Sequence, residues 1–216
     1  ERLESHMLIE EFMLLANRKV SEFVSLNRKG ETTGNTFVYR VHDDPNPTKL
    51  EALREFVGTF GYKMNLANSK KVAESLNNLL RDVKGKGEEN MIETLAMRSM
   101  SKAVYSTNPI GHYGLGFEYY SHFTSPIRRY SDLLVHRIIS SNLDGALARE
   151  IDRFRSETAS MAAYLSAREE VVDEAERESV RLKLLQYMER HVGDVFSGVI
   201  SGVVSTGFFV ELENSA

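Results

Sequence analysis

Apolar residues recur at helical spacing from the start of the chain and predict a helix there. They follow a period of about 3.6 residues; the positions are Leu8, Phe12, Leu15, Val20 and Phe23. We expect this helix to end near Gly30. Arg28 and Lys29 would then stand in its last turn, where the helix dipole favours positive charge.

The middle of the chain combines short strands with helices. The pattern predicts strands over residues 36–42, 102–106 and 113–124. Between the first two it predicts a turn with two prolines and three helices, at residues 49–60, 69–83 and 88–100.

The last part of the chain opens on a Ser-Pro step. Ser125 and Pro126 predict the start of a helix that runs to about Asn142, since serine is a favoured N-cap and proline a favoured first helical residue. A long charged helix, or a pair of helices, is expected over residues 146–189. From His191 onward, β-branched residues and glycines predict two strands of a small barrel that the chain does not complete. Both ends of the sequence are therefore expected to be cut.

Composition narrows the classes of protein that fit. The 216 residues have a formal net charge of −4, with 42% hydrophobic and 27% charged residues. The absence of cysteine excludes disulfides and thiolate metal sites. No stretch approaches the roughly 20 apolar residues of a membrane span. We expect a soluble cytoplasmic protein in which any contact with nucleic acid is confined to a local cationic patch.

The helix predicted from Pro126 places charged residues together. Arg128, Asp132 and His136 are four residues apart, so Asp132 is expected to accept hydrogen bonds from both neighbours. A helix N-terminus favours an anion, and Arg128 and Arg129 add guanidinium groups that match phosphate oxygens. The pattern favours a phosphate-binding site. The alternative is that both arginines pair with acidic residues elsewhere in the fold.

A longer stretch carries a family resemblance. The segment "HYGLGFEYYSHFTSPIRRYSDLLVH", residues 112–136, resembles the signature of the RNB nuclease domain, found in the RNase II and RNase R family of 3′→5′ exoribonucleases. "LIEEFMLLAN" and "AMRSMSKAVYS" resemble further stretches of that domain in the same order. The RNase R branch is the more similar, and the resemblance covers essentially the whole chain.

The resemblance implies an α+β fold in two parts. Residues 1–190 would be the mostly helical C-terminal portion of an RNB ribonuclease domain, whose N-terminal part is missing. Residues 191–216 would be the incomplete beginning of an S1-type OB-fold RNA-binding domain.

The resemblance also implies an activity. Family members degrade single-stranded RNA to nucleoside 5′-monophosphates, using Mg²⁺ held by a cluster of aspartates. We find no equivalent cluster here, because Asp43 and Asp44 precede a proline in a turn, where aspartates usually bond their own backbone. The metal ligands are therefore expected outside this chain, in the missing N-terminal part, and the chain alone is expected to be inactive. The alternative is a catalytically inactive homologue that acts as an RNA-binding or regulatory module.

Individual roles follow from the same resemblance. Arg128 matches the arginine near the scissile phosphate and is predicted to be catalytic. Other residues are predicted to contact RNA: Arg129, Glu10, Glu11, Asn17, Tyr119 and Glu176. A third group is predicted to support the site: Ser125, Pro126, Asp132, His136 and His112.

Alternatives stay open for several of these residues. One of Glu10 and Glu11, which interrupt an apolar helix, is expected to be buried and to recognise the ribose, or to act only as a structural strut. Glu176 lies in an acidic run that could be a solvated face. Aromatic residues such as Tyr119 could stack on bases or belong to the core, and Phe123 and Tyr130 are assigned to the core.

Overall fold

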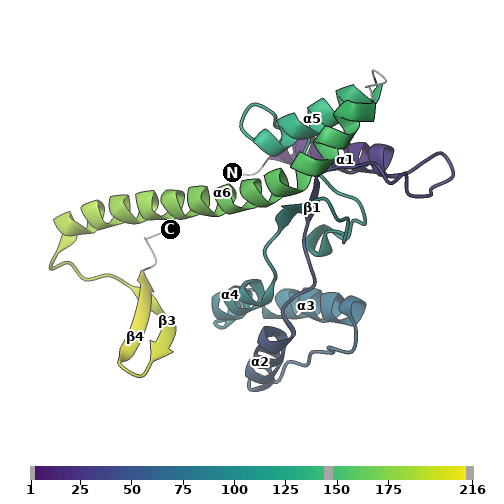
Figure 1. Cartoon of the computed structure of the whole chain (residues 1–216). Helices are drawn as coiled ribbons and strands as arrows, with labels where there is room; N and C mark the ends of the chain where they lie inside the picture. The colour runs from purple at the N-terminus through teal and green to yellow at the C-terminus, as the bar shows by residue number, and fades with distance from the viewer. Residues whose placement is uncertain (1–2, 144–147, 213–216) are drawn as a thin grey trace.

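The computed structural model describes residues 3–143 and 148–212 and shows an α+β fold that is mostly helical (Figure 1). The elements, in chain order, are α1 (Glu4–Ser25), β1 (Tyr39–Val41), α2 (Pro47–Gly58), α3 (Ser69–Val83), α4 (Glu89–Ser99), β2 (Val104–Ser106), the 3-10 helix η1 (Tyr113–Leu115), α5 (Tyr130–Leu143), α6 (Ala148–Met188), the 3-10 helix η2 (Glu189–His191), β3 (Gly198–Val204) and β4 (Gly207–Leu212).

A first core forms around the short antiparallel pair of β1 and β2, in which Arg40 lies opposite Tyr105. Both strands contribute buried side chains, as do the C-terminal end of α1, α5 and the first half of α6. The members of this core are Val24, Phe37, Val38, Tyr39, Val41, Tyr105, Leu134, Val135, Ile138 and Ala162. It brings together segments that are more than 100 residues apart in the sequence.

A second core belongs to the three-helix unit, which we define as α2, α3 and α4. The chain leaves β1, forms this unit and returns through β2, and Figure 1 shows the three helices grouped apart from α1 and α5. Its buried residues are almost all aliphatic: Leu50, Leu53, Val57, Met64, Val72, Leu76, Leu79, Val83, Ile92 and Ala96. The unit therefore packs mainly on itself.

The helical predictions for this unit are confirmed. Helix α3 has the predicted bounds, and α4 differs by one residue at each end. Helix α2 begins at Pro47, two residues early, because the Asn46 side chain accepts from the Lys49 N–H and caps it.

The predicted end of the first helix is wrong, because α1 ends at Ser25 rather than near Gly30. Leu26 is already extended, and Asn27 then closes a turn through Glu31 and Gly30.

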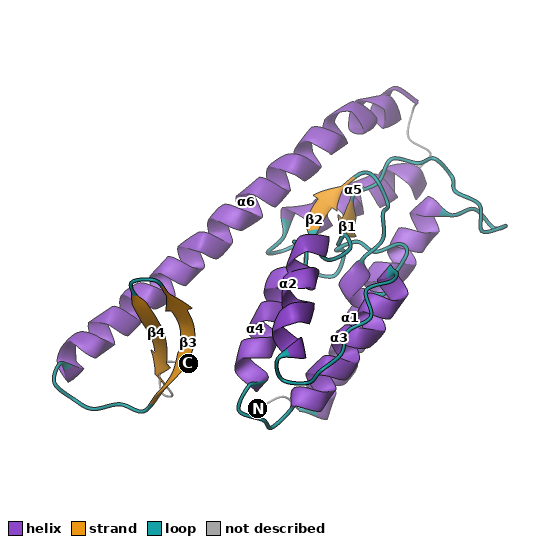
Figure 2. Cartoon of the chain, turned by 90° about the horizontal axis from the view of Figure 1, so that it is seen from below, coloured by secondary structure: helices purple, strands orange, loops and turns teal. Residues whose placement is uncertain are grey.

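Two sequence predictions about other elements are wrong, and one that was left open is decided. Residues 113–124 form η1 and irregular backbone instead of a strand, interrupted by Gly116 in the left-handed region at a φ of 66°. Helix α5 begins at Tyr130, so Ser125 and Pro126 lie in a turn before it. Of the two alternatives for the charged region, the single helix is confirmed: α6 is one continuous helix of 41 residues, as Figure 2 shows. The predicted start of that region, at residue 146, lies outside the described residues.

The predicted pair of strands near the C-terminus is present. Strands β3 and β4 form an antiparallel hairpin, with Gly198 opposite Leu212 and an irregularity in register between Ile200 and Gly202. None of the described helices combines the length and the apolar character needed to cross a membrane.

Candidate functional site

The candidate site is built on the arginine turn, which we define as residues Ser125–Arg129. The turn connects irregular backbone to α5, and Arg128 and Arg129 both donate their backbone N–H to the Ser125 carbonyl, at 3.3 and 3.0 Å. Its side chains differ in environment, since Ile127 is fully exposed whereas the Arg129 side chain is only 20% exposed. The turn thus projects from the core instead of packing a helical face against it.

Asp132 fixes this turn from the first turn of α5. Its carboxylate is fully buried and accepts from the Ser125 N–H at 2.7 Å and from Ser131 Oγ at 3.1 Å. Arg129 completes the set with two bonds, from Nε at 2.8 Å and Nη2 at 2.9 Å. Such a two-pronged pair between guanidinium and carboxylate is strong and directional. Asp132 therefore satisfies the backbone at the start of the arginine turn and balances the charge of one arginine.

This arrangement corrects the predicted partners of Asp132. We expected Arg128 and His136, but Arg129 and Ser125 occupy those places. The reason is the later start of α5: the backbone at 128 and 129 is a turn, so helical four-residue spacing does not apply there. His136 instead meets the Phe123 carbonyl through Nε2 at 2.9 Å and stacks on the Phe123 ring at 4.2 Å between centroids.

Arg128 remains as the uncompensated cation of the turn. Its side chain is exposed, and it makes no hydrogen bond or ion pair within the described part of the chain. Arg128 and Arg129 carry two positive charges and Asp132 one negative charge, so these three groups sum to +1. The net positive charge of the arginine turn therefore lies on the exposed guanidinium of Arg128.

Asn17 holds the backbone that leads into the arginine turn. Its side chain is 4% exposed, and its Oδ1 accepts from the N–H groups of Phe123 at 2.9 Å and Thr124 at 3.2 Å. Its Nδ2 donates to the Tyr120 hydroxyl at 3.1 Å. The amide of Asn17 thus makes three hydrogen bonds within the protein, and its predicted contact with RNA stays a prediction.

A cavity of about 390 Å³ lies between α1 and this backbone, and we call it the α1 cavity. Its lining combines apolar residues with a few polar ones: His6, Ile9, Glu10, Met13, Leu14, Asn17, Tyr120, Thr124 and Arg129. Glu10 and Arg129 thus line one concave site although more than 100 residues separate them in the sequence. The expected burial of Glu10 or Glu11 is wrong, because both are exposed, and only Glu10 lines the cavity.

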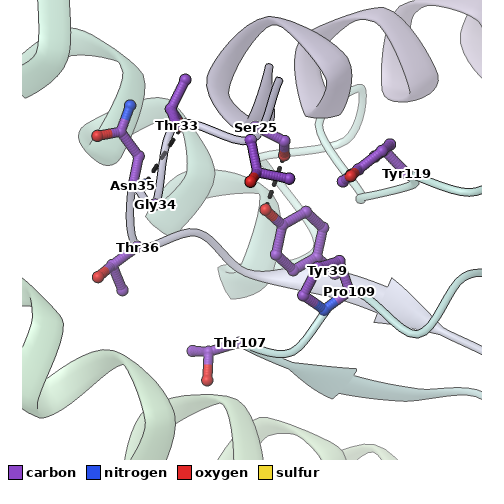
Figure 3. Close-up of a pocket in the computed structure, with 10 residues that line it drawn as sticks. Ser25, Thr33, Gly34, Asn35, Thr36, Tyr39, Thr107, Pro109 and Tyr119 are labelled. Carbon is purple, nitrogen blue, oxygen red and sulfur yellow. Dashed lines mark hydrogen bonds between the residues drawn. The ribbon is translucent and has the colours of Figure 1, made fainter. Parts of the chain in front are cut away.

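Other predicted site residues lie elsewhere. Glu176 is exposed on α6 and does not line the α1 cavity. Tyr119 lines a second pocket of about 310 Å³ beside Ser25 and Tyr39, whose hydroxyls are 2.7 Å apart (Figure 3). None of the described residues that line this second pocket is charged. Tyr120, the neighbour of Tyr119, lines the α1 cavity instead. The sequence offered one signal to distinguish the two tyrosines: side chains of consecutive residues in an extended chain point in opposite directions.

Of the two aromatic residues assigned to the core, Phe123 and Tyr130, one lies there. Phe123 packs against the first core, as predicted. Tyr130 is 46% exposed and lies beneath the guanidinium of Arg137, whose carbon is 5.9 Å from the ring centre. The first turn of α5 therefore turns Tyr130 away from the core.

Two histidines near the turn are held neutral. Burial, with Arg129 and Arg40 nearby, lowers the pKa of His122 to about 3, and its Nδ1 lies 2.8 Å from the Tyr105 hydroxyl. Burial, with His42 and Arg40 nearby, lowers the pKa of His112 to about 4. His112 Nδ1 accepts from the Leu115 N–H and so supports η1 rather than the α1 cavity.

The described residues do not fit a divalent metal ion. Nowhere among residues 3–143 and 148–212 do three histidine, aspartate or glutamate side chains converge as ligands. Asp43 accepts from the Asp44 N–H at 2.8 Å, and Asp44 accepts from Ser69 Oγ at 2.7 Å. Asp43 thus makes the local bond expected of a turn, whereas Asp44 binds the first residue of α3, 25 positions away.

Comparison with known proteins identifies the family. The RNB domain matches residues 1–145, which include α1, the arginine turn and α5. The chain belongs to the RNB-domain family. Ribonuclease R of Aquifex aeolicus is 39% identical over 217 residues, covering 100% of this chain and 29% of the relative. The chain thus spans less than a third of the length of this RNB-family relative.

Solved structures agree with the family. RNase R of Mycoplasma genitalium, in complex with ribose methylated single-stranded RNA, superposes with a TM-score of 0.83 at 32% identity; the match covers 98% of this chain and 32% of that one. Yeast Ssd1, described as a pseudonuclease, matches with a TM-score of 0.59 at 24% identity over 77% of this chain. The second likeness concerns the fold alone. The RNB fold is therefore present in proteins described as nuclease and as pseudonuclease.

Proposed function

We propose that this chain supplies the substrate side of a 3′→5′ exoribonuclease that hydrolyses single-stranded RNA to nucleoside 5′-monophosphates. One observation carries the proposal: Glu10 and Arg129 line a single cavity, and the exposed Arg128 stands on the adjoining turn. Membership of the RNB family and the similarity to Ribonuclease R support it.

In this proposal Arg128 stabilises the charge that develops on the phosphate during hydrolysis. Arg129 already shares its charge with Asp132, while Arg128 has no such partner within the described residues. A cation aimed at developing negative charge is an effective source of catalysis. Arg129 positions the turn, and its Nη1, which neither bond to Asp132 uses, is the group left to contact RNA.

Glu10 is proposed as the carboxylate that recognises the ribose. It lines the α1 cavity and Glu11 does not, although the two are adjacent on α1. A carboxylate that accepts from the ribose 2′-OH would distinguish RNA from DNA. The predicted RNA contacts of Tyr119 and Glu176 stay predictions, and they require an RNA that extends beyond the α1 cavity.

The metal ion belongs to another part of the protein in this proposal. Because the described residues do not converge as metal ligands, we propose that aspartates outside this chain hold Mg²⁺ and that no step of hydrolysis is completed by these residues alone. We also propose the division into an RNB portion, residues 1–190, and the first strands of an S1-type OB fold, residues 191–216. The β3–β4 hairpin supports it.

The test uses the complete enzyme and a 5′-labelled single-stranded RNA with Mg²⁺. We expect products that shorten from the 3′ end, and Arg128→Ala should lower turnover about 100-fold or more with a smaller change in RNA affinity. Arg137→Ala is the control, because that exposed arginine lies on α5 against Tyr130 and not at the cavity. Unchanged turnover in Arg128→Ala would refute its role. RNA binding without shortening by the wild-type enzyme would favour the inactive homologue.

A further inference from the structure

Asn17 is the first buried residue of α1. Residues 3–16 are exposed or half-exposed, so the part of the helix that carries Glu10 extends beyond the first core. Four residues later Ser21 is fully buried, and Val24 belongs to the core. Asn17 therefore marks the place where the cavity-lining part of α1 meets the rest of the fold.

The Asn17 amide makes three hydrogen bonds, two of them to backbone N–H groups and one to a side chain. Its oxygen receives two consecutive N–H groups, of Phe123 and Thr124, and its nitrogen binds the Tyr120 hydroxyl. A buried N–H without an acceptor costs about 1–3 kcal/mol, so these contacts specify one position of the backbone relative to α1. An apolar side chain of the same size could fill the space but could not select that position.

Three side chains together fix the backbone over three consecutive residues. Asn17 binds the N–H groups of Phe123 and Thr124, His136 binds the Phe123 carbonyl, and Asp132 binds the Ser125 N–H. His136 and Asp132 belong to α5, which follows the turn directly. Asn17 alone of the three belongs to α1, so it is the member that relates the turn to Glu10.

We propose that Asn17 is a positioning residue that sets the placement of the Glu10 carboxylate relative to the arginine turn; this inference rests on the proposed function. Glu10 precedes Asn17 by seven residues, or about 10 Å along a helix, and on nearly the same face. A small change in the tilt of α1 at Asn17 therefore displaces Glu10 from the turn. Misplacement of a substrate by about 1 Å can cost on the order of 100-fold in rate.

The experiment compares variants of the complete enzyme in steady-state hydrolysis of single-stranded RNA, with kcat and KM measured separately. Asn17→Leu keeps the volume and removes both hydrogen-bonding groups. Asn17→Asp keeps an oxygen for the two N–H groups, and the Tyr120 hydroxyl can turn to donate to it. Ser21→Ala is the matched control, because Ser21 is buried one turn later on α1 and its hydroxyl has no hydrogen-bond partner among the described residues.

We expect kcat to fall at least tenfold in Asn17→Leu and to stay within threefold of wild type in Asn17→Asp and Ser21→Ala. The added charge of Asn17→Asp should appear in KM, through repulsion of RNA phosphates. If Asn17→Leu does not fold, Asn17→Ser replaces it in the experiment. The serine side chain is shorter, so its oxygen cannot reach the N–H groups of Phe123 and Thr124. The same fall in kcat is expected.

The outcomes separate this inference from the proposed function. A folded Asn17→Leu or Asn17→Ser enzyme with wild-type kcat would overturn the positioning role while RNA hydrolysis by the wild type still supports the proposed function. An Asn17→Asp variant with the same loss of kcat as Asn17→Leu would also overturn it. A wild-type enzyme that does not shorten RNA would refute the proposed function and this inference with it.

Discussion

The first core and the three-helix unit are stabilised by different kinds of contact. The three-helix unit buries aliphatic side chains, and among the described side chains only Ser99 is a buried polar residue there. The other buried polar side chains lie around the first core: Asn17, Ser21, Ser25, Ser121, Ser131, Asp132 and Thr158. The polar groups accompany irregular backbone, whereas the aliphatic core accompanies regular helices.

The difference has a physical cause. A helix satisfies its own backbone N–H and carbonyl groups, so a helical unit needs only an apolar face to pack. Residues 116–129 have little regular structure, and their backbone groups must find partners elsewhere. Asn17, Asp132 and His136 provide those partners. The first core thus tolerates the exposed arginine turn because buried side chains fix the backbone on both sides of it.

The largest expected effect on stability follows from removing Asp132. In Asp132→Ala the Ser125 N–H loses its acceptor and Arg129 is left half-buried without its partner. Breaking such a pair costs about 3–5 kcal/mol, which should appear in the free energy of unfolding from urea denaturation. Asp132→Asn is the matched control, because it keeps one acceptor oxygen and should lose less. Equal losses in both variants would contradict the assignment of two functions to this carboxylate.

The three-helix unit should respond to a different change. Leu76 on α3 is 3% exposed and belongs to the second core, so Leu76→Ala should cost about 3 kcal/mol through lost burial and a residual cavity. The loss should be confined to this unit, with faster hydrogen exchange in α2–α4 and little change in β1 and β2. Lys70→Ala is the control, since Lys70 is exposed on the same helix. Uniform loss of protection across both regions would show that they unfold together.

The same difference explains what the sequence could predict. The bounds of α3 were predicted because Val72, Leu76, Leu79 and Val83 repeat at helical spacing. Nothing in residues 113–124 indicates that their backbone bonds to Asn17, more than 100 positions away, and their aromatic residues therefore suggested a strand.

The site was predicted in part for a related reason. Local sequence identified the arginine pair, and the resemblance pointed to the Glu10–Glu11 pair. Which arginine binds Asp132, and which glutamate lines the α1 cavity, depends on the three-dimensional arrangement. A helix from Pro126 would have paired Arg128 with Asp132, but the observed start at Tyr130 gives that place to Arg129. Tyr120 and Thr124 were missed as cavity residues, because their position depends on long-range bonds to Asn17.

The smallest expected effect is a pH dependence confined to the first core. His112 and His122 have pKa values of about 4 and about 3 in the fold, against 6.5 for the unperturbed group. Between pH 6.5 and these values the unfolded chain binds more protons than the folded one. Stability is therefore complete above about pH 6.5 and falls as pH decreases, by on the order of 1 kcal/mol per histidine at pH 5 after allowance for partial exposure.

The three-helix unit is an internal control for this prediction, since residues 47–100 contain no histidine. Hydrogen exchange at pH 7 and pH 5, corrected for intrinsic rates, should show protection falling in β1, β2 and residues 112–122 while α2–α4 keep theirs. Urea denaturation should show a loss of about 2 kcal/mol over the same interval. Equal loss in both regions would mean that the three-helix unit unfolds with the first core. An unchanged first core at pH 5 would mean that its buried histidines accept protons without cost.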